Sequence, residues 1–265
     1  EGKTLSFDEL VERIAPKDLI FVGEVHDNPE HHLIQVQILQ ALIASPGPLV
    51  IAMEFFQQGH QVALDRYLRG EITEAEFLRD VNWNESWGYD YLLYRPLLLM
   101  AKEKGIKVLA LNAPAAIVKK VAREGLKGLD LDERDQLPLD IDLTVEAHRA
   151  YLLNIYRRHP HEDLKDFEYF YEAQCVWEET MARNLSKYQR ETGERLVVFA
   201  GSGHIIHKFG IPDRTIRRSP AALVTIMPYP IGKKEAFERE TADYVWLTPD
   251  YPHRAVRPSM GRTRP

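Results

Sequence analysis

Six short runs of apolar, often β-branched residues recur along the chain, and stretches of helical character separate most of them. The predicted strands cover residues 18–24, 49–56, 107–114, 195–204, 222–229 and 243–249, the last being a weaker edge strand. Within these runs the apolar residues are continuous rather than alternating, which is typical of parallel strands covered on both faces. The chain is therefore predicted to have an α/β fold with a mainly parallel β-sheet flanked by helices.

Helix signals lie between the predicted strands. Asn28 and Pro29 supply an N-cap and a proline at the first helical position, and the helix that follows is expected to end at about residue 44. Two more helices are predicted over about residues 57–69 and 91–104.

Residues 115–190 interrupt the alternation of strands and helices. They contain no convincing strand and are predicted to form helices around an acidic loop, so we interpret them as a helical insertion that covers the open end of the sheet. The α/β core then consists of residues 1–114 and 191–250. Residues 251–265, rich in proline and arginine, are predicted to be a flexible tail.

The composition argues against two kinds of partner. The formal net charge is -6 and no long basic stripe is present, which disfavours nucleic-acid binding. No apolar run approaches the ~20 residues that a membrane span requires. The chain starts at Glu1 rather than at a methionine, which fits either removal of a signal peptide or lipoprotein leader or a shortened chain. Membrane association is expected only through such a leader.

Polar side chains stand at the carboxyl ends of four predicted strands, where each apolar run gives way to a loop. In chain order these are Glu24 with His26, Glu54, Asn112, and Ser202 with His204. Ligands of open parallel sheets bind outside the carboxyl ends of the strands, because loops and helix N-termini gather there. We therefore expect Glu24, His26, Glu54 and His204, hereafter the strand-end cluster, to converge on one pocket.

Two Gly-x-x-His elements contribute the histidines of this cluster, one from Gly23 to His26 and the other from Gly201 to His204. A glycine permits a tight strand-to-loop turn and lets a ligand approach the backbone. Two histidines and two glutamates suit a divalent metal ion, whose bound water would be activated for hydrolysis. Without a metal, His26 is a candidate general base oriented by either glutamate.

Four further residues are candidates for binding a larger ligand. His31 and His32 lie in the first turn of the helix after Asn28, where they either pack and face solvent, or one of them faces the rim and donates to an anionic ligand. Tyr91 and Tyr94 belong to the segment WGYDYLLYRP, in which most tyrosines are expected to pack and form hydrogen bonds.

Taken together, these residues resemble the ChaN family of haem-binding uptake proteins in the Tiki superfamily. The matching pieces are GEVHDNPEHH, AMEFF with Gln61, LNAP, AQCVWEETMA and AGSGHI, in the family's order and within residues 18–229. One departure is Glu178, where the resemblance leads us to expect an aspartate.

The resemblance implies an α/β fold with a helical subdomain. It also implies non-covalent haem binding linked to iron acquisition, often by a lipoprotein anchored in the cell envelope. The wider superfamily includes metal-dependent proteases and erythromycin-esterase relatives that use paired Gly-x-x-His motifs with glutamates. Those motifs match the strand-end cluster of this chain.

Haem binding is the first of two functional hypotheses. Ferric haem needs a histidine or tyrosine ligand, apolar walls and donors for two propionates, and Tyr91, Tyr94, His31 and His32 are the candidate haem-binding residues. We predict that haem lies apart from the strand-end cluster, whose glutamates would repel the propionates. A flat apolar ligand left half-exposed on one subunit would favour a homodimer that covers it.

The second hypothesis is a hydrolase of protease or esterase type. Glu24, His26, Glu54 and His204 would then be both the catalytic residues and the ligands of one divalent metal ion. Ser202 is not a convincing nucleophile, because it does not lie in a Gly-x-Ser-x-Gly turn.

Overall fold

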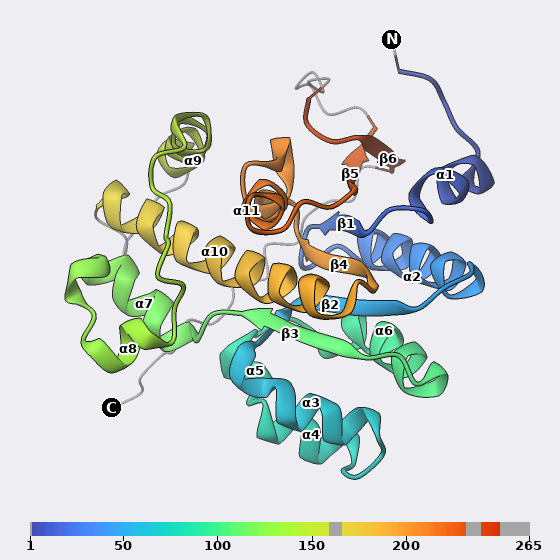
Figure 1. Cartoon of the computed structure of the whole chain (residues 1–265), viewed down its shortest axis with the longest axis horizontal. Coiled ribbons are helices and arrows are strands. Elements are labelled where there is room, and N and C mark those ends of the chain that lie inside the picture. The colour runs from blue at the N-terminus through green and yellow to red at the C-terminus, as the bar shows by residue number, and fades with distance from the viewer. Residues whose placement is uncertain (1, 159–165, 232–239, 250–265) are drawn as a thin grey trace.

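The fold is built on a single parallel sheet. The computed structural model describes residues 2–158, 166–231 and 240–249. The six strands of the sheet follow the order β3-β2-β4-β1-β5-β6, and each neighbouring pair is parallel (Figure 1). The strands are β1 (Leu19–Glu24), β2 (Leu49–Gln57), β3 (Val108–Asn112), β4 (Arg195–Gly201), β5 (Leu223–Pro230) and β6 (Tyr244–Thr248). The predicted α/β fold with a parallel sheet flanked by helices is confirmed.

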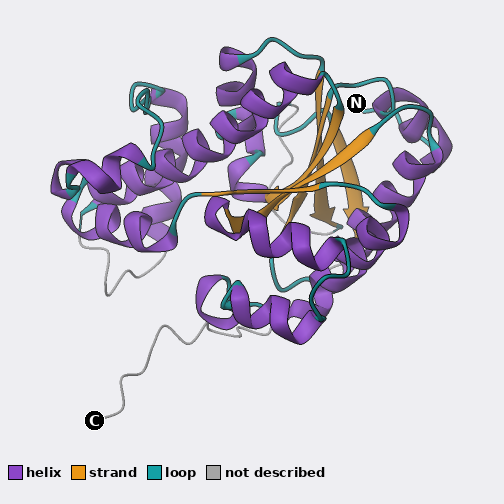
Figure 2. Ribbon diagram, turned by 60° about the horizontal axis from the view of Figure 1, so that its bottom comes forward, coloured by secondary structure: helices purple, strands orange, loops and turns teal. Residues whose placement is uncertain are grey.

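Helices cover both faces of this sheet (Figure 2). Those described are α1 (Phe7–Ile14), α2 (Pro29–Ala44), α3 (Gln61–Leu68), α4 (Glu74–Asp80), α5 (Trp83–Ser86), α6 (Tyr91–Lys104), α7 (Ala115–Glu124), α8 (Leu131–Asp135), α9 (Glu146–Arg158), α10 (Phe167–Thr192) and α11 (Ile211–Arg218). The Asn28 side chain caps α2 by accepting a hydrogen bond from the backbone N–H of Glu30 at 3.0 Å, as the sequence predicts. The helix expected at 57–69 instead begins with a 3-10 turn, Gln58–His60.

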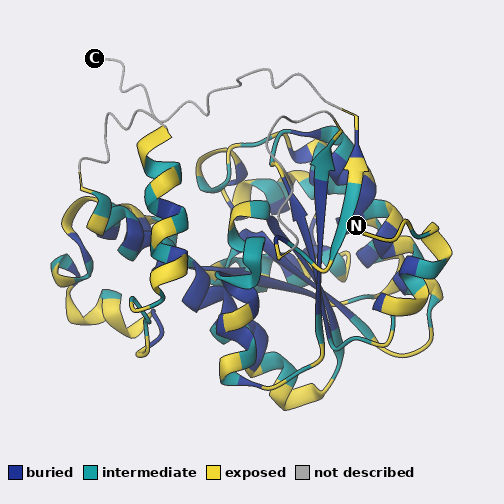
Figure 3. Ribbon diagram, turned by 90° about the horizontal axis from the view of Figure 1, so that it is seen from above, coloured by how far each residue is buried: buried dark blue, intermediate teal, exposed yellow. Residues whose placement is uncertain are grey.

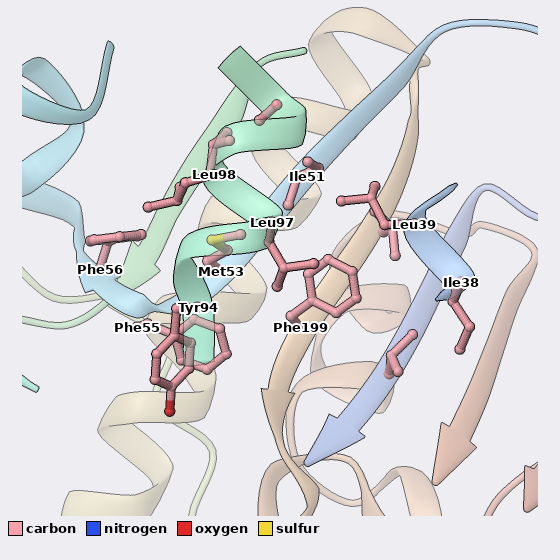
Figure 4. Packing of buried hydrophobic residues seen from close by; sticks show 14 of the residues in the cluster. Ile38, Leu39, Ile51, Met53, Phe55, Phe56, Tyr94, Leu97, Leu98 and Phe199 are labelled. Carbon is pink, nitrogen blue, oxygen red and sulfur yellow. The ribbon is translucent and has the colours of Figure 1, made fainter. Parts of the chain in front are cut away.

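Burial of both faces explains the continuous apolar runs in the sequence (Figure 3). Successive residues of a strand point to opposite faces, so Ile20 and Val22 belong to one core and Leu19 and Phe21 to the other. The first core also contains Ile38 and Leu39 of α2 with Leu97 and Leu98 of α6 (Figure 4). The second contains Met181, Ala182 and Leu185 of α10 with Ile211 of α11.

Helix α10 belongs to three packing groups, one of which joins its Tyr171 and Cys175 to Leu152 of α9. Near its start, Ala173 and Val176 pack in a small separate core with Ile117 and Val121 of α7. Its later part packs on the sheet, while α7, α8 and α9 lie beyond the carboxyl end of β3 (Figure 1). The division into an α/β core and an insertion over residues 115–190 stays a prediction, and the predicted tail, 251–265, lies outside the described residues.

None of the helices that the structure describes is both long enough and apolar enough to cross a lipid bilayer.

Candidate functional site

The structure brings the strand-end cluster together at the carboxyl edge of the sheet. Strands β2, β4 and β1 are neighbours, and Glu24 at the end of β1 is aligned with Gly201 at the end of β4. Glu54 of β2 accepts a hydrogen bond through Oε2 from the backbone N–H of Gly201 at 2.7 Å. His204 lies in a 3-10 turn after β4, and its Nε2 is 3.4 Å from Glu54 Oε1.

In the first Glu–His pair of the cluster, one ring nitrogen makes no hydrogen bond with the described residues. His26 Nδ1 lies 2.7 Å from Glu24 Oε1, while Gln35 Nε2 donates to Glu24 Oε2 at 2.8 Å. A carboxylate accepts hydrogen bonds and does not donate them, so Nδ1 carries the proton in this pair and Nε2 of neutral His26 keeps its lone pair. The His26 side chain is 26% exposed, whereas that of Glu24 is fully buried. His26 can therefore meet a ligand or substrate through Nε2.

The second histidine is held between two buried glutamates. His204 Nδ1 is 3.2 Å from Glu178 Oε1, on the side of the ring opposite to Glu54. Burial alone favours the neutral forms of all three groups, but the opposite charges outweigh it and raise the pKa of His204 to about 10. The same charges, with His148 contributing at Glu178, lower the pKa of both glutamates to about 2. His204 is therefore a charged imidazolium at neutral pH.

His26 differs from His204 in its surroundings. Burial lowers the pKa of His26, but the hydrogen bond with Glu24 and the negative charges of Glu24 and Glu54 raise it above its ordinary value. The positive charge of His204 opposes that rise. One histidine of the cluster is thus fixed between two carboxylates, and the other binds one carboxylate and stays partly exposed.

The two Gly-x-x-His elements pack against each other. A β-carbon on Gly23 would lie 2.7 Å from Ser202 Oγ, and a β-carbon on Gly201 would lie 2.8 Å from His26 Cε1. Each glycine therefore makes room for a side chain of the other element. The space beside each glycine is thus occupied by the protein rather than left for a ligand to approach the backbone.

A buried charged network lies behind His204. Glu178 Oε2 accepts a hydrogen bond from Arg214 Nε at 3.3 Å, and Glu178 Oε1 lies 3.4 Å from His148 Nε2. Arg214 also donates to Glu179, the residue that follows Glu178 in α10. All four side chains of this network are buried.

Sequence reasoning missed these supporting residues. It noted Glu178 only as a departure from the expected aspartate, and it did not single out His148 or Arg214. The available signal was a pair of glutamates inside the apolar stripe of α10, between Trp177 and Met181, because buried carboxylates need partners.

Half-buried aromatic rings border the cluster. The rings of Trp87 and Tyr89 lie 4.8 and 4.9 Å from the His26 ring, measured between centroids. The Trp177 ring lies 6.0 Å from that of His204. In the part of the chain that the structure describes, the Tyr89 hydroxyl makes no hydrogen bond. The cluster therefore has apolar ring surface beside its partly exposed histidine.

Two of the predicted haem-binding residues support the cluster from inside. Tyr94 is buried, and its hydroxyl lies 3.3 Å from Glu24 Oε1 and 3.2 Å from the backbone oxygen of His26. His32 is also buried, with Nε2 3.1 Å from the same backbone oxygen. Its Nδ1 is 3.3 Å from Glu24 Oε2 without hydrogen-bond geometry. These contacts fix the position of Glu24 and of the loop that carries His26.

The other two predicted haem-binding residues, His31 and Tyr91, contact protein groups near them. The backbone N–H of Val25 donates to His31 Nδ1 at 2.9 Å. The hydroxyl of Tyr91 lies 3.4 Å from Glu74 Oε2. Both side chains are buried, which does not favour contact with haem. The assignment of His31 and Tyr91 to haem binding stays a prediction.

The predicted divalent-metal site is not supported. Within residues 2–158, 166–231 and 240–249, no group of three or more His, Cys, Asp or Glu side chains is arranged to hold a metal ion. The reason is that Glu24 and Glu54 turn their oxygens toward ring, amide and backbone N–H groups rather than toward a common point. Asn112 likewise turns its Oδ1 to the backbone N–H of Ala113.

Comparison with solved structures shows a shared fold. ChaN of Campylobacter jejuni, whose structure is described by its cofacial haem binding, is 22% identical, has a TM-score of 0.72, and matches over 92% of each chain. A mutant of the erythromycin esterase EreC in its open conformation is 14% identical, with a TM-score of 0.54 over 86% of this chain and 74% of that one.

Sequence comparison identifies the family. Protein RETICULATA-RELATED 5, chloroplastic, from Arabidopsis thaliana is 24% identical over an alignment of 261 positions, and the match covers 89% of this chain and 35% of that protein. This chain thus spans about a third of the length of that curated relative. The family model described as haem-binding uptake, Tiki superfamily, ChaN matches residues 10–215, well over half of the chain. The chain therefore belongs to the ChaN family of haem-binding uptake proteins within the Tiki superfamily.

Proposed function

We propose that this protein binds haem non-covalently and serves in haem or iron uptake. The observation that carries the proposal is the match of residues 10–215 to the haem-binding uptake family. The fold shared with ChaN of Campylobacter jejuni, a protein described by its cofacial haem binding, supports it. Haem is here a cargo whose iron needs an axial ligand from the protein.

The border of the strand-end cluster offers such a ligand. His26 Nε2 makes no hydrogen bond within the described part of the chain, and its Nδ1 is held by a buried carboxylate, an arrangement that orients metal-ligating histidines and raises their basicity. The rings of Trp87 and Tyr89 beside it suit a flat apolar ligand. His26 therefore fits an axial ligand of haem iron.

The tyrosines fit this role less well. Burial and nearby negative charges raise the pKa of Tyr91 and Tyr94, which opposes formation of the phenolate that binds ferric iron. The pKa of Tyr89 is raised by burial and by the charges of Asp27, Glu54 and Glu24. Among these candidates, Tyr89 has a hydroxyl that makes no hydrogen bond with the described residues, so it is the tyrosine to compare with His26.

Titration with monomeric haemin, followed at the Soret band, tests the proposal. We expect a saturable change for the unaltered protein, a weaker and spectrally different one for His26→Ala, and little change for Tyr89→Phe. The matched control is His60→Ala, since His60 is a half-buried histidine whose ring accepts a hydrogen bond from the backbone of Gln57. A protein that shows no saturable change contradicts haem binding.

A double variant decides where haem lies. Combining His26→Ala with His204→Ala removes both histidines of the strand-end cluster. Unchanged haem affinity in the folded double variant would place haem apart from the cluster, as we predicted from the sequence, and would contradict His26 as the axial ligand. Loss of binding would make the cluster itself the haem site.

We also propose that the haem-loaded protein is a homodimer, and that it is located in the cell envelope, a location that the family resemblance implies. A haem left half-exposed by one subunit gains apolar cover from a second. Sedimentation analysis with and without haemin tests the dimer, and fractionation of cells that carry the full-length protein tests the location. A monomer at saturating haemin, or recovery outside the envelope, contradicts the respective proposal.

A second candidate function is metal-independent hydrolysis of esters or amides. The observation that favours it is the same free Nε2 of His26, because a histidine oriented by a carboxylate is the usual form of a general base. In this step Nε2 takes a proton from water while the water oxygen bonds to the substrate carbonyl carbon. The tetrahedral intermediate then expels the alcohol or amine, which receives that proton from His26 and leaves a carboxylic acid.

A panel of ester and amide substrates, measured in the presence of EDTA, tests this second function. We expect turnover to survive EDTA and to fall by about 10²–10⁴-fold in His26→Ala. Activity that EDTA abolishes and a divalent ion restores would contradict the metal-independent mechanism.

A further inference from the structure

Glu178 differs from the glutamates of the strand-end cluster in that it connects a histidine to a buried cation. Its Oε1 lies 3.2 Å from His204 Nδ1, and its Oε2 accepts a hydrogen bond from Arg214 Nε at 3.3 Å. His148 Nε2 lies 3.4 Å from the same Oε1. Both carboxylate oxygens are thus tied to other elements, because His148 belongs to α9 and Arg214 to α11.

The start of α11 closes in on this carboxylate. A β-carbon on Gly210 would lie 2.8 Å from Glu178 Oε1 and 2.4 Å from the backbone oxygen of His204. The glycine before α11 therefore lets the backbone come close to the Glu178 carboxylate and to the backbone of His204 at once.

We propose that Glu178, held by Arg214 and His148, is the positioning residue that fixes the ring of His204 so that its Nε2 edge faces Glu54 and the site. Among the described residues, the Nε2 side of the ring has one polar contact, the 3.4 Å approach of Glu54 Oε1. An imidazole held from one side alone can rotate, whereas contact with a carboxylate at each nitrogen fixes its plane and its proton positions. The raised pKa of His204 agrees with two anionic neighbours.

Glu179 provides an internal comparison. It is also buried and also bonds Arg214, and it pairs with Arg217 at 2.8 Å. It makes no contact with His204 among the described residues. Two adjacent glutamates therefore share one arginine, but only Glu178 reaches the site.

What this positioning of His204 does for catalysis rests on the second candidate function, the hydrolysis of esters or amides. A fixed His204 places an N–H group and a positive charge next to Glu54, beside the general base His26. Such preset charge needs no reorganisation during the reaction.

Histidine NMR on the full-length protein at neutral pH tests the positioning role. With ¹⁵N-labelled histidine, we expect His204 to show a slowly exchanging, downfield Nδ1–H resonance that Glu178→Gln removes or shifts. Glu179→Gln, the matched control, should leave this resonance in place. If the protein hydrolyses esters, Glu178→Gln should lower kcat with little change in KM, and Glu178→Asp should restore part of kcat.

Two outcomes overturn the proposal. One is an unchanged His204 resonance in folded Glu178→Gln, and the other is an equal change in Glu179→Gln, which would indicate a general packing effect. If Glu178→Gln does not fold, Arg214→Lys is measured in its place, because this change keeps the positive charge but weakens the contact of residue 214 with Glu178. A His204 resonance that stays sharp and unshifted in Arg214→Lys contradicts the proposal. Absence of hydrolysis contradicts the second candidate function alone, since the NMR comparison does not depend on turnover.

Discussion

Gly201 lies so close to His26 that a β-carbon on the glycine would stand 2.8 Å from His26 Cε1 and 3.2 Å from Nε2. The backbone N–H of Gly201 donates at the same time to Glu54. One residue of β4 therefore sets the distance between a histidine in the loop after β1 and a glutamate in β2. The arrangement of this site therefore requires a residue without a side chain at position 201.

Replacing Gly201 with alanine should disturb His26. The added methyl group forces the ring or the backbone to move, which should lower the free energy of unfolding by about 1–3 kcal/mol. Haem affinity or hydrolysis that depends on His26 should fall as well. The control is Gly203→Ala, because nothing lies within 4 Å of a β-carbon there. Equal effects of the two substitutions in urea unfolding would contradict the steric argument.

Replacing Arg214 with alanine should be severe. The substitution leaves Glu178 and Glu179 buried without their shared cation, and breaking a buried pair in this way costs about 3–5 kcal/mol. Arg217→Ala is the control, since the Arg217 side chain is 41% exposed and exposed ion pairs contribute at most about 1 kcal/mol. Comparable losses in chemical denaturation would show that burial of the arginine does not matter.

The trio of His204, Glu54 and Glu178 should make stability depend on pH in both directions. The pKa of His204 rises from 6.5 to about 10 on folding, so its contribution is complete below about pH 6.5 and is lost as the pH rises toward 10. The pKa of each glutamate falls from 4.5 to about 2, so their contributions are complete above about pH 4.5 and are lost as the pH falls toward 2. The contribution of the trio should be greatest between these limits.

Urea unfolding at about pH 5.5, 8 and 9.5 measures the alkaline side of this dependence. The variant His204→Gln removes the titrating ring, so its stability should change less over that range than the stability of the unaltered protein. Parallel curves for the two proteins would mean that His204 is not the group responsible.

Tyr94→Phe should affect stability more than haem binding. The hydroxyl lies within hydrogen-bond distance of Glu24 and of the backbone oxygen of His26, and losing one such bond costs about 1 kcal/mol. Haemin affinity should stay within about twofold, a difference well under 1 kcal/mol, because the buried phenol supports Glu24 rather than facing a ligand. A large loss of haemin affinity in the folded variant would instead support the predicted role of Tyr94 as a haem ligand.

Strands β1 to β5 could be read from the sequence because they are largely buried on both faces, which leaves a continuous apolar run, whereas the edge strand β6, with its exposed Leu247, was the weaker prediction. Their ends were less well predicted. The run predicted to extend to residue 204 stops at Gly201, where Ser202–His204 form a 3-10 turn that returns the histidine over the sheet. The site residues were identifiable for a related reason: a charged residue at the end of a buried strand has to meet a partner or a ligand.

Which partners meet was decided only by the tertiary structure. The order β2-β4-β1 places Glu54 beside Gly201 and His204, although 147 residues separate Glu54 from Gly201 in the chain. Glu178 and Arg214 reach the site because α10 and α11 pack side by side on one face of the sheet. Tyr94 points inward because it lies on the face of α6 that packs into the first core, with Leu97 and Leu98 (Figure 4). Local sequence records the chemistry of each side chain, whereas these contacts depend on how distant helices and strands pack together.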